Sequence, residues 1–277
     1  MYQTLIESHQ LAQLLEQDNP LVLDCRFALG KPEWGRQEYL RGHIPGAVYV
    51  DLEQDMSGPP VTDRGAHPMP AATALEALFS RLGVGPGRQV VAYDQQQGAF
   101  AARLWWLLKY MGHQGVAVLD GGSAAWRRAG RPERSGEEQP VSARFTGRPR
   151  TDRLVTLDEL EKVPLLIDAR AARRYRGEVE PLYAVAGHIP GARNCPYEDH
   201  IDDDGKVIAA EEIRTHVQEI LGDVPAAQAV YSCGSGVTAC HLLLTAMHSG
   251  LDEGRIYVGS YSEWVSDPAR AIATGNE

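Results

Sequence analysis

The chain has 277 residues, 43% of them hydrophobic, so it is long enough to form one large or two ordinary globular domains. Its 27 Lys and Arg residues against 37 Asp and Glu residues give a formal net charge of −10, which argues against nucleic-acid or anionic-membrane partners. No basic residue precedes Arg26, and Arg103 and Lys109 interrupt the most apolar stretch, so we expect neither a signal peptide nor a membrane span. Four cysteines without an export signal predict reduced thiols in a cytoplasmic protein.

The N-terminal half alternates short apolar strands with helices. Leu11, Leu14 and Leu15 lie at helical spacing and predict an amphipathic helix that ends at Pro20. Further along we expect strands at residues 21–23, 90–93 and 116–119, and helices at residues 72–82 and 100–110. Such alternation indicates an α/β fold with a mostly parallel sheet and helices on both faces, in which ligands bind at the carboxyl ends of the strands.

The C-terminal half repeats the N-terminal half. The repeated pairs are PLVLDCR (20–26) with PLLIDAR (164–170), RGHIPGA (41–47) with AGHIPGA (186–192), VVAYD (90–94) with AVYSC (229–233), and GGSAAW (121–126) with GSYSEW (259–264). Thr156 and Glu159 form a capping box ahead of a helix in the second copy, which Pro164 ends. We therefore predict an N-terminal domain at 1–130, a linker rich in Pro, Gly and charge at 131–152, and a C-terminal domain at 153–277.

Several polar residues recur in both copies. They are Asp24 and Arg26 with Asp168 and Arg170, expected as buried ion pairs at strand ends, and His43 with His188, each before a Pro-Gly turn. Because they also occur in the copy that has no cysteine at the position of Cys233, we assign them to the scaffold.

The stretch AVYSCGSGVTACH (229–241) predicts a strand, a tight loop and a helix, with Cys233 as the first loop residue. Gly234 and Gly236 let the backbone turn its N–H groups inward, and the following helix adds its positive end. Both features favour a thiolate, which is the nucleophilic form of cysteine. The alternative, a buried structural cysteine, gives no reason for a loop rich in glycine.

The other cysteines lack these features. Cys25 and Cys195 have no glycine loop and are expected in the core, and Cys240 would lie two helical turns below Cys233. No cysteine pair has CxxC spacing and the histidines are scattered, so we expect no metal site. The first copy has DQQQGAFA at residues 94–101 in place of the cysteine loop and is expected to be catalytically inert.

The motif CGSGVTA resembles the active-site loop of the rhodanese superfamily, and most nearly that of its 3-mercaptopyruvate sulfurtransferases. This resemblance covers the whole chain and implies two tandem rhodanese-like domains. It further implies a sulfurtransferase in which Cys233 takes up a sulfane sulfur as a persulfide, with no metal or organic cofactor. The substrate-binding loop residues would be Gly234, Gly236, Val237 and Thr238.

The resemblance also implies further site residues. DMSGP (55–59) and HPMP (67–70) are similar to family motifs, which implies a proton relay of Asp55, His67 and Ser235. Without the resemblance, the Pro-rich surroundings of His67 favour a loop histidine with no catalytic role. Arg174 matches the family's carboxylate-binding arginine. The chain departs from mercaptopyruvate enzymes where it lacks their second arginine and has Leu182 and Tyr183 instead.

These residues leave several functions open. The donor is expected to be 3-mercaptopyruvate, because the Gly234–Ser235 loop is neutral, with thiosulfate as the alternative donor. The acceptor would be a thiol such as thioredoxin or glutathione, or cyanide. A cysteine phosphatase or arsenate reductase is disfavoured because residues 234–238 hold no arginine. A redox-sensing or sulfur-carrier-binding protein remains as a further alternative. The sequence leaves the physiological acceptor, oligomeric state and pathway undetermined.

Overall fold

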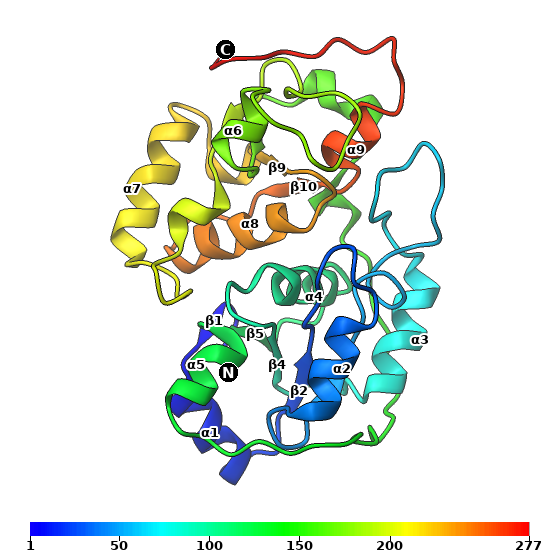
Figure 1. The fold of residues 1–277 in the computed structure, drawn as a ribbon, viewed down its shortest axis with the longest axis vertical. Coiled ribbons are helices and arrows are strands. Elements are labelled where there is room, and N and C mark those ends of the chain that lie inside the picture. The colour runs from blue at the N-terminus through cyan, green and yellow to red at the C-terminus, as the bar shows by residue number, and fades with distance from the viewer. Residues whose placement is uncertain (277) are drawn as a thin grey trace. The chain divides into compact units, whose positions relative to one another are not determined.

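The computed structural model describes residues 1–276, which form two compact units (Figure 1). The first unit comprises Met1–Gly58, Pro70–Arg150 and Asp202–Val207, and the second holds the remaining described residues, including Pro59–Met69. Two short segments are thus exchanged between the halves of the sequence. No helix within residues 1–276 is long and apolar enough to cross a membrane.

The first unit contains one parallel five-stranded sheet in the order β1-β5-β4-β2-β3. Its strands are β1 (Leu5–Ile6), β2 (Leu21–Asp24), β3 (Val48–Tyr49), β4 (Val90–Tyr93) and β5 (Val116–Leu119). Its helices are α1 (Ser8–Gln17), α2 (Trp34–Arg41), α3 (Ala72–Leu82), α4 (Ala99–Tyr110) and α5 (Gly122–Arg128). The predicted helices at 72–82 and 100–110 correspond to α3 and α4.

Side-chain alternation along these strands buries both faces of the first sheet. Val22, Val91, Tyr93 and Ala117 pack in one cluster with residues from α1 and α5. Helix α4 contacts β4 and β5, and all of its residues except Phe100 are buried. Figure 1 shows α1 and α5 on the opposite side of the strands from α3. A parallel sheet covered in this way needs nearly continuous apolar strands, as the sequence has.

The second unit repeats this topology with the order β6-β10-β9-β7-β8, again with every pairing parallel. Its strands are β6 (Leu154–Val155), β7 (Leu166–Asp168), β8 (Arg193–Asn194), β9 (Val230–Ser232) and β10 (Arg255–Tyr257). Its α-helices are α6 (Ala172–Tyr175), α7 (Ala210–Leu221), α8 (Thr238–His248) and α9 (Ser260–Trp264). Short 3-10 helices are η1 (Thr151–Arg153), η2 (Leu157–Lys162), η3 (Tyr197–His200) and η4 (Ala226–Gln228). The predicted fold class is confirmed.

The opening helix of the second copy differs from the prediction. The capping box is present, with the Glu159 side chain accepting the N–H of Thr156, but the segment that follows is the 3-10 helix η2 rather than an α-helix. Only six residues separate Thr156 from Val163, and the ring of Pro164 disfavours the α conformation at Val163. A longer helix has no room here.

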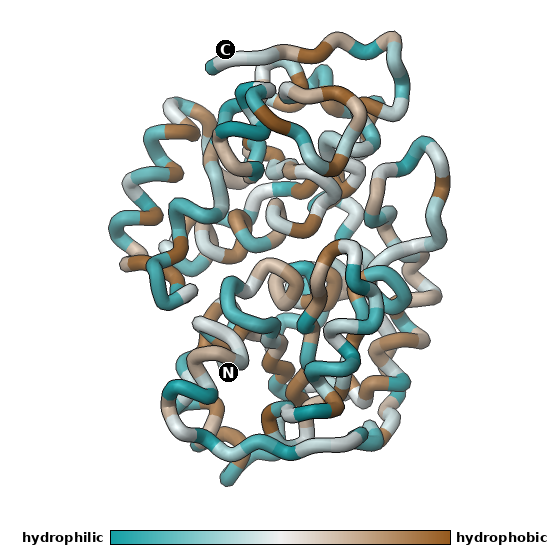
Figure 2. The backbone as a smooth tube through the Cα atoms, viewed as in Figure 1, coloured by the Kyte–Doolittle hydropathy of each residue, from teal (hydrophilic) through white to brown (hydrophobic). Residues whose placement is uncertain are grey.

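Amphipathic and extended segments surround these sheets. Hydrophobic and hydrophilic residues alternate along α7, whose buried side chains are Ile213, Val217 and Leu221 (Figure 2). Residues 135–150 contain no helix or strand and hydrogen-bond along the first unit, for example from the Arg148 N–H to the Met111 carbonyl oxygen at 3.0 Å. The linker predicted at 131–152 is therefore mostly extended chain laid on the first unit.

The repeated polar residues have the predicted scaffold role. Asp24 and Arg26 form a fully buried ion pair at 2.6 Å, and Asp168 and Arg170 form another at 2.7 Å. Each guanidinium also donates to a backbone carbonyl of the following turn. The same ion pair therefore joins a strand end to a turn in each unit.

Candidate active site

Cys233 is the first residue of a tight loop between β9 and α8, and its side chain is 1% exposed. Gly236 has a φ of +75°, and a Cβ there would lie 2.5 Å from the carbonyl oxygen of Val258, so a larger residue does not fit. A Cβ at Gly234 would lie 2.9 Å from the hydroxyl oxygen of Tyr183. The two glycines therefore let the loop approach its neighbours closely around the sulfur.

Backbone and hydroxyl groups fix the orientation of Cys233. Its Sγ accepts the N–H of Gly236 at 3.2 Å, and its own N–H donates to Ser260 Oγ at 3.1 Å. The N–H of Tyr261 donates to the Cys233 carbonyl oxygen at 3.0 Å. Ser260 has a φ of +54°, a conformation rarely adopted by residues other than glycine, and its hydroxyl donates to the Tyr257 carbonyl oxygen at 2.9 Å. The start of α9 thus holds the loop in place.

The structure brings two members of the predicted relay together. His67 Nδ1 lies 2.8 Å from Ser235 Oγ, and both residues are buried. The segment that carries His67 belongs to the second unit, where the N–H of Ala66 also donates to Ser262 Oγ at 3.0 Å. A histidine from the first half of the sequence is therefore placed beside the cysteine loop.

Arg174 and Tyr183 flank the same loop. Nearest to a Cβ built on Gly234 are the Tyr183 hydroxyl at 2.9 Å and the Arg174 Nη2 at 3.6 Å. The Arg174 guanidinium is held by Glu180 at 2.8 Å and lies 5.7 Å from the centre of the Tyr183 ring. Glu180 also pairs with the buried Arg170 at 3.3 Å, so Arg174 is fixed to the scaffold while its side chain stays 20% exposed.

Tyr183 is a site residue that the sequence indicated only as a departure from the family pattern. Burial and the charge of Cys233 raise the pKa of its phenol, whereas Arg174 and hydrogen bonds with Ser235 and Ser262 lower it. Those interactions place the phenol against the loop. Leu182, its neighbour, is exposed, and its N–H donates to Glu180 at 3.0 Å. The remaining predicted loop residues, Val237 and Thr238, form the junction with α8, where Val237 is buried.

Comparisons with known proteins agree with this geometry. A sequence profile described as the Rhodanese-like domain matches residues 7–129 and again residues 153–267. The chain belongs to the rhodanese-like family.

Named relatives extend over its full length. It is 44% identical over 281 residues to a probable 3-mercaptopyruvate sulfurtransferase of Pseudomonas aeruginosa, covering 98% of each chain. It is 37% identical over 288 residues to a putative thiosulfate sulfurtransferase of Mycobacterium tuberculosis, covering 99% of this chain and 98% of the relative. Among solved structures, the 3-mercaptopyruvate sulfurtransferase from Leishmania major superposes with a TM-score of 0.84 at 31% identity, covering 95% of this chain and 74% of that one.

The first rhodanese-like domain holds an aspartate at the position of Cys233. The Asp94 carboxylate is fully buried and accepts four backbone N–H groups at 2.9 to 3.4 Å, two from its own loop (Gln96 and Gly98) and two from the first turn of α4 (Phe100 and Ala101). Burial raises its pKa, although these hydrogen bonds lower it. This rhodanese-like loop therefore surrounds a carboxylate and contains no thiol.

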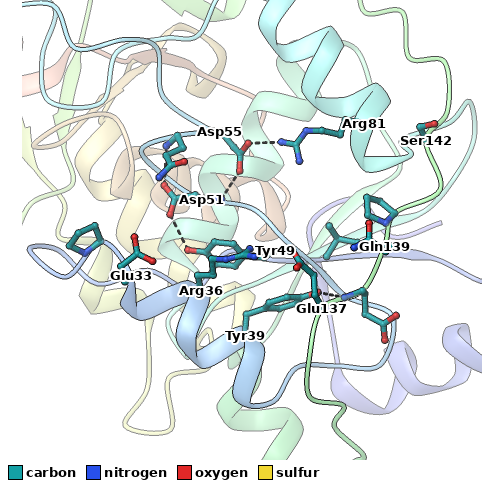
Figure 3. Close-up of a pocket in the computed structure, with 15 residues that line it drawn as sticks. Glu33, Arg36, Tyr39, Tyr49, Asp51, Asp55, Arg81, Glu137, Gln139 and Ser142 are labelled. Atoms are coloured by element: carbon teal, nitrogen blue, oxygen red, sulfur yellow. Dashed lines mark hydrogen bonds and ion pairs between the residues drawn. The ribbon is translucent and has the colours of Figure 1, made fainter.

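Asp55, the third member of the predicted relay, lies in the first unit beside a pocket of about 630 Å³ (Figure 3). Its Oδ1 pairs with Arg81 at 2.6 Å and its Oδ2 accepts the N–H of Asp51 at 2.9 Å. Asp51 in turn accepts the Tyr49 hydroxyl at 3.0 Å. The observed partners of Asp55 belong to this pocket, and its role in a relay stays a prediction.

The other three cysteines have partners or surroundings that disfavour a thiolate. Burial, and next the charge of Asp24, raises the pKa of Cys25 well above its ordinary value, and burial raises that of Cys195 to about 12. Cys240 donates its thiol hydrogen to the Gly236 carbonyl oxygen at 3.2 Å. Within this rhodanese-like chain, the thiol that faces a glycine loop is Cys233.

Proposed function

We propose that this protein is a sulfurtransferase that takes a sulfane sulfur from 3-mercaptopyruvate and passes it on through a Cys233 persulfide. The observation that carries the proposal is the placement of Cys233, whose sulfur accepts a loop N–H while the His67–Ser235 pair lies in the same loop. The names of the related proteins support the same reaction class.

The first half-reaction forms one S–S bond and breaks one C–S bond. The Cys233 thiolate attacks the sulfur of 3-mercaptopyruvate, and the electron pair of the C–S bond moves to carbon to give the enolate of pyruvate. The donor's sulfur, with its hydrogen, stays on Cys233 as a persulfide. The enolate takes up one proton and leaves as pyruvate. The loop N–H groups, such as that of Gly236, stabilise the negative charge on sulfur.

The proton for the enolate is proposed to come from the His67–Ser235 pair. An imidazole exchanges protons near neutral pH, and Ser235 Oγ at 2.8 Å from Nδ1 provides the hydroxyl through which the proton reaches the loop. Arg174 would bind the donor's carboxylate, because Glu180 orients its guanidinium and leaves part of it exposed. Tyr183 would supply a neutral hydrogen-bond donor where mercaptopyruvate enzymes have a second arginine.

The second half-reaction returns the enzyme to its starting state. An acceptor thiolate or cyanide attacks the outer sulfur of the persulfide, which releases the Cys233 thiolate and forms the acceptor's persulfide or, from cyanide, thiocyanate. Thioredoxin, glutathione or cyanide are the acceptors that we propose, and the cytoplasm is the proposed compartment. Because the sulfur is carried on Cys233 itself, we propose that the transfer uses no organic cofactor.

Thiosulfate is the second candidate donor, and one observation favours it. Arg174 flanks the loop, but Leu182 and Tyr183 stand where the family's mercaptopyruvate enzymes have a second arginine. Steady-state kinetics with each donor at neutral pH, together with intact mass for one added sulfur, tests the choice. We expect the larger kcat/KM for 3-mercaptopyruvate but with a high KM, and a larger kcat/KM for thiosulfate would overturn the donor assignment.

The same measurement separates an enzyme from a sulfur-carrier-binding or redox-sensing protein. A sensor would accept one sulfur or one oxidising equivalent at Cys233 and then stop. A sulfurtransferase releases many equivalents of pyruvate or sulfite per chain when an acceptor thiol is present. A single stoichiometric burst with both donors would reject the enzymatic proposal.

A further inference from the structure

Three side chains that the sulfur-transfer reaction does not use converge in the second unit. Cys195 follows β8, His200 ends η3 and His216 lies in α7. Their sulfur and ring nitrogen atoms all lie within 4.8 Å of one another. His200 Nε2 is 3.2 Å from His216 Nδ1, and the two rings meet edge to face. Residues in or next to three successive elements thus form one cluster of soft and borderline donors.

The hydrogen bonds of His200 fix which of its nitrogens carries a lone pair. Thr245 Oγ1 donates its one hydrogen to the Leu242 carbonyl oxygen at 3.0 Å, so it must accept from His200 Nδ1 at 2.9 Å. A neutral imidazole that is protonated at Nδ1 has its lone pair at Nε2. In His200 that lone pair faces His216 Nδ1 at 3.2 Å and belongs to the cluster. A hydrogen-bond acceptor that fixes the tautomer in this way is the usual support of a metal-binding histidine.

We propose that Cys195, His200 and His216 bind one Zn²⁺ ion. Zinc prefers four ligands from cysteine and histidine at about 2.0 to 2.3 Å, which separates two nitrogen ligands by about 3.3 Å and a nitrogen from a sulfur by about 3.6 Å. The cluster meets this spacing after a closure of at most about 1.2 Å between the Cys195 sulfur and a ring nitrogen. The fourth ligand is a water molecule on the side of His216, which is only half-buried, whereas Cys195 and His200 are buried. Binding replaces the proton of the Cys195 thiol, which leaves to solvent, and forms a Zn–S bond.

The site would act as a structural clamp. It joins the end of β8, η3 and α7, and α7 packs on α8, the helix that follows the Cys233 loop. The proposal is independent of sulfur transfer, because none of its three ligands touches Cys233 in the mechanism above. An ion that binds the folded chain alone raises the unfolding temperature, and the stabilisation grows with the logarithm of the ion concentration divided by its Kd.

The test uses the full chain with Cys233→Ser, so that the active-site thiol cannot bind the ion. Zn²⁺ is titrated against a competing chelator, and Co²⁺ absorption reports whether a thiolate is bound. We expect one ion per chain, a thiolate-to-cobalt charge-transfer band, and a higher Tm with Zn²⁺. Cys195→Ser should remove the band, and both Cys195→Ser and His216→Ala should weaken Zn²⁺ binding at least tenfold.

Two matched variants serve as controls. Cys240→Ser changes a buried cysteine that is not one of the three proposed ligands. His9→Ala changes a histidine on α1 of the first unit. Both should bind Zn²⁺ as the parent does. If Cys195→Ser disturbs folding, His216→Ala on a half-buried position of α7 still decides the question. The proposal is overturned if His216→Ala binds Zn²⁺ as tightly as the parent. It is also overturned if the parent binds Zn²⁺ no more tightly than both Cys195→Ser and His216→Ala.

Discussion

The loops that begin at Asp94 and at Cys233 occupy the same place in the two rhodanese-like domains, after the strands β4 and β9. Each is five residues long, at 94–98 and 233–237, and each leads directly into a buried helix. In both, the first residue's carbonyl oxygen accepts an N–H from the helix that follows the next strand, from Ser123 of α5 to Asp94 at 2.9 Å and from Tyr261 of α9 to Cys233 at 3.0 Å. The fold therefore builds one loop scaffold twice.

The difference lies in what the loop encloses. The first loop is filled by a carboxylate that accepts two N–H groups of the loop and two of the first turn of α4, so the hydrogen-bonding capacity of these N–H groups is used within the fold. The second encloses a sulfur that accepts the N–H of Gly236, and it faces the His67–Ser235 pair, Arg174 and Tyr183. A loop that stabilises anions becomes a reaction site only where its anion is a nucleophile with room beside it.

The largest effect is expected from Cys233→Ser. Removing the thiolate removes the only nucleophile that we assign to the loop, so sulfur transfer should fall to background with either donor. Steady-state assays and intact mass after donor treatment measure this. Cys25→Ser and Cys240→Ser, which change buried thiols outside the loop, should still add one sulfur per chain. Persulfide formation in Cys233→Ser would mean that the second loop is not the reaction site.

Arg174→Ala should be next in size. A charge-assisted hydrogen bond contributes roughly 1.5 to 3 kcal/mol, so we expect kcat/KM to fall by about 10- to 100-fold for both 3-mercaptopyruvate and thiosulfate. The neighbouring Arg173→Ala is the matched control, because Arg173 is 72% exposed and pairs with Glu178. If both variants behave alike, the anion-binding role of Arg174 is wrong.

Asp94→Ala tests the first loop by its stability. Removal of the carboxylate leaves four backbone N–H groups without their acceptor, so the free energy of unfolding should fall by about 2 to 4 kcal/mol in urea titrations. Asp203→Ala, an exposed change of the same charge, should have no such effect. Sulfur transfer by the second domain should persist wherever the variant is folded.

The pH dependence of this difference has a definite sign. Burial raises the folded-state pKa of Asp94 above its unfolded value. The protonated Asp94 therefore contributes to the stability of the folded chain. This contribution is complete when the pH is below the unfolded-state pKa, and it is lost as the pH rises through the folded-state pKa. The stability difference between the parent and Asp94→Ala should be larger near about pH 4 than near about pH 7. A difference that grows with pH would contradict the raised pKa.

Ser260→Gly gives the second domain the residue that the first domain has at the corresponding position, and we expect a smaller effect from it. The repeat places Gly122 at the corresponding position of the first domain, with a φ of +55° against +54° for Ser260. A residue other than glycine is unfavourable there, yet Ser260 accepts the Cys233 N–H. We expect Ser260→Gly to keep or raise Tm and to lower kcat by about 3- to 10-fold, as expected for loss of one net hydrogen bond. Unchanged kcat would show that Ser260 does not position Cys233.

The sequence predicted the parts of the fold that depend on local pattern. The helix expected at 72–82 is α3 (Ala72–Leu82), because its buried residues Leu75, Leu78, Phe79 and Leu82 recur at helical spacing. The buried ion pairs Asp24–Arg26 and Asp168–Arg170 followed from their repetition in both copies. His67 beside Ser235 followed from a family motif and not from periodicity.

Features that depend on how distant segments of the chain come together could not be predicted. The exchanged segments Pro59–Met69 and Asp202–Val207 have no apolar periodicity, and Lys206 pairs with Glu7 of the first unit through a contact that no spacing rule indicates. The cluster of Cys195, His200 and His216 joins three elements and has no metal-binding spacing in the sequence. Ser260 carried a usable signal, a serine aligned with a positive-φ glycine of the first copy.

The smallest expected effect is that of Asp94→Cys, which places a thiol in the first loop and should not create a second reaction site. The Gln95 side chain is held by hydrogen bonds to the backbone of Phe27 at 3.0 and 3.3 Å, so the loop is lined by a fixed amide where the second loop has Gly234. Gln96 packs against Gly205, which leaves little freedom for the loop to open around a persulfide. With Cys233 intact, intact mass should therefore show one added sulfur per chain after donor treatment. The contrary result would be two added sulfurs in Asp94→Cys, and one added sulfur in the double variant Asp94→Cys, Cys233→Ser. It would mean that a thiol and the loop N–H groups suffice for persulfide formation, and that the residues around the second loop matter less than we propose.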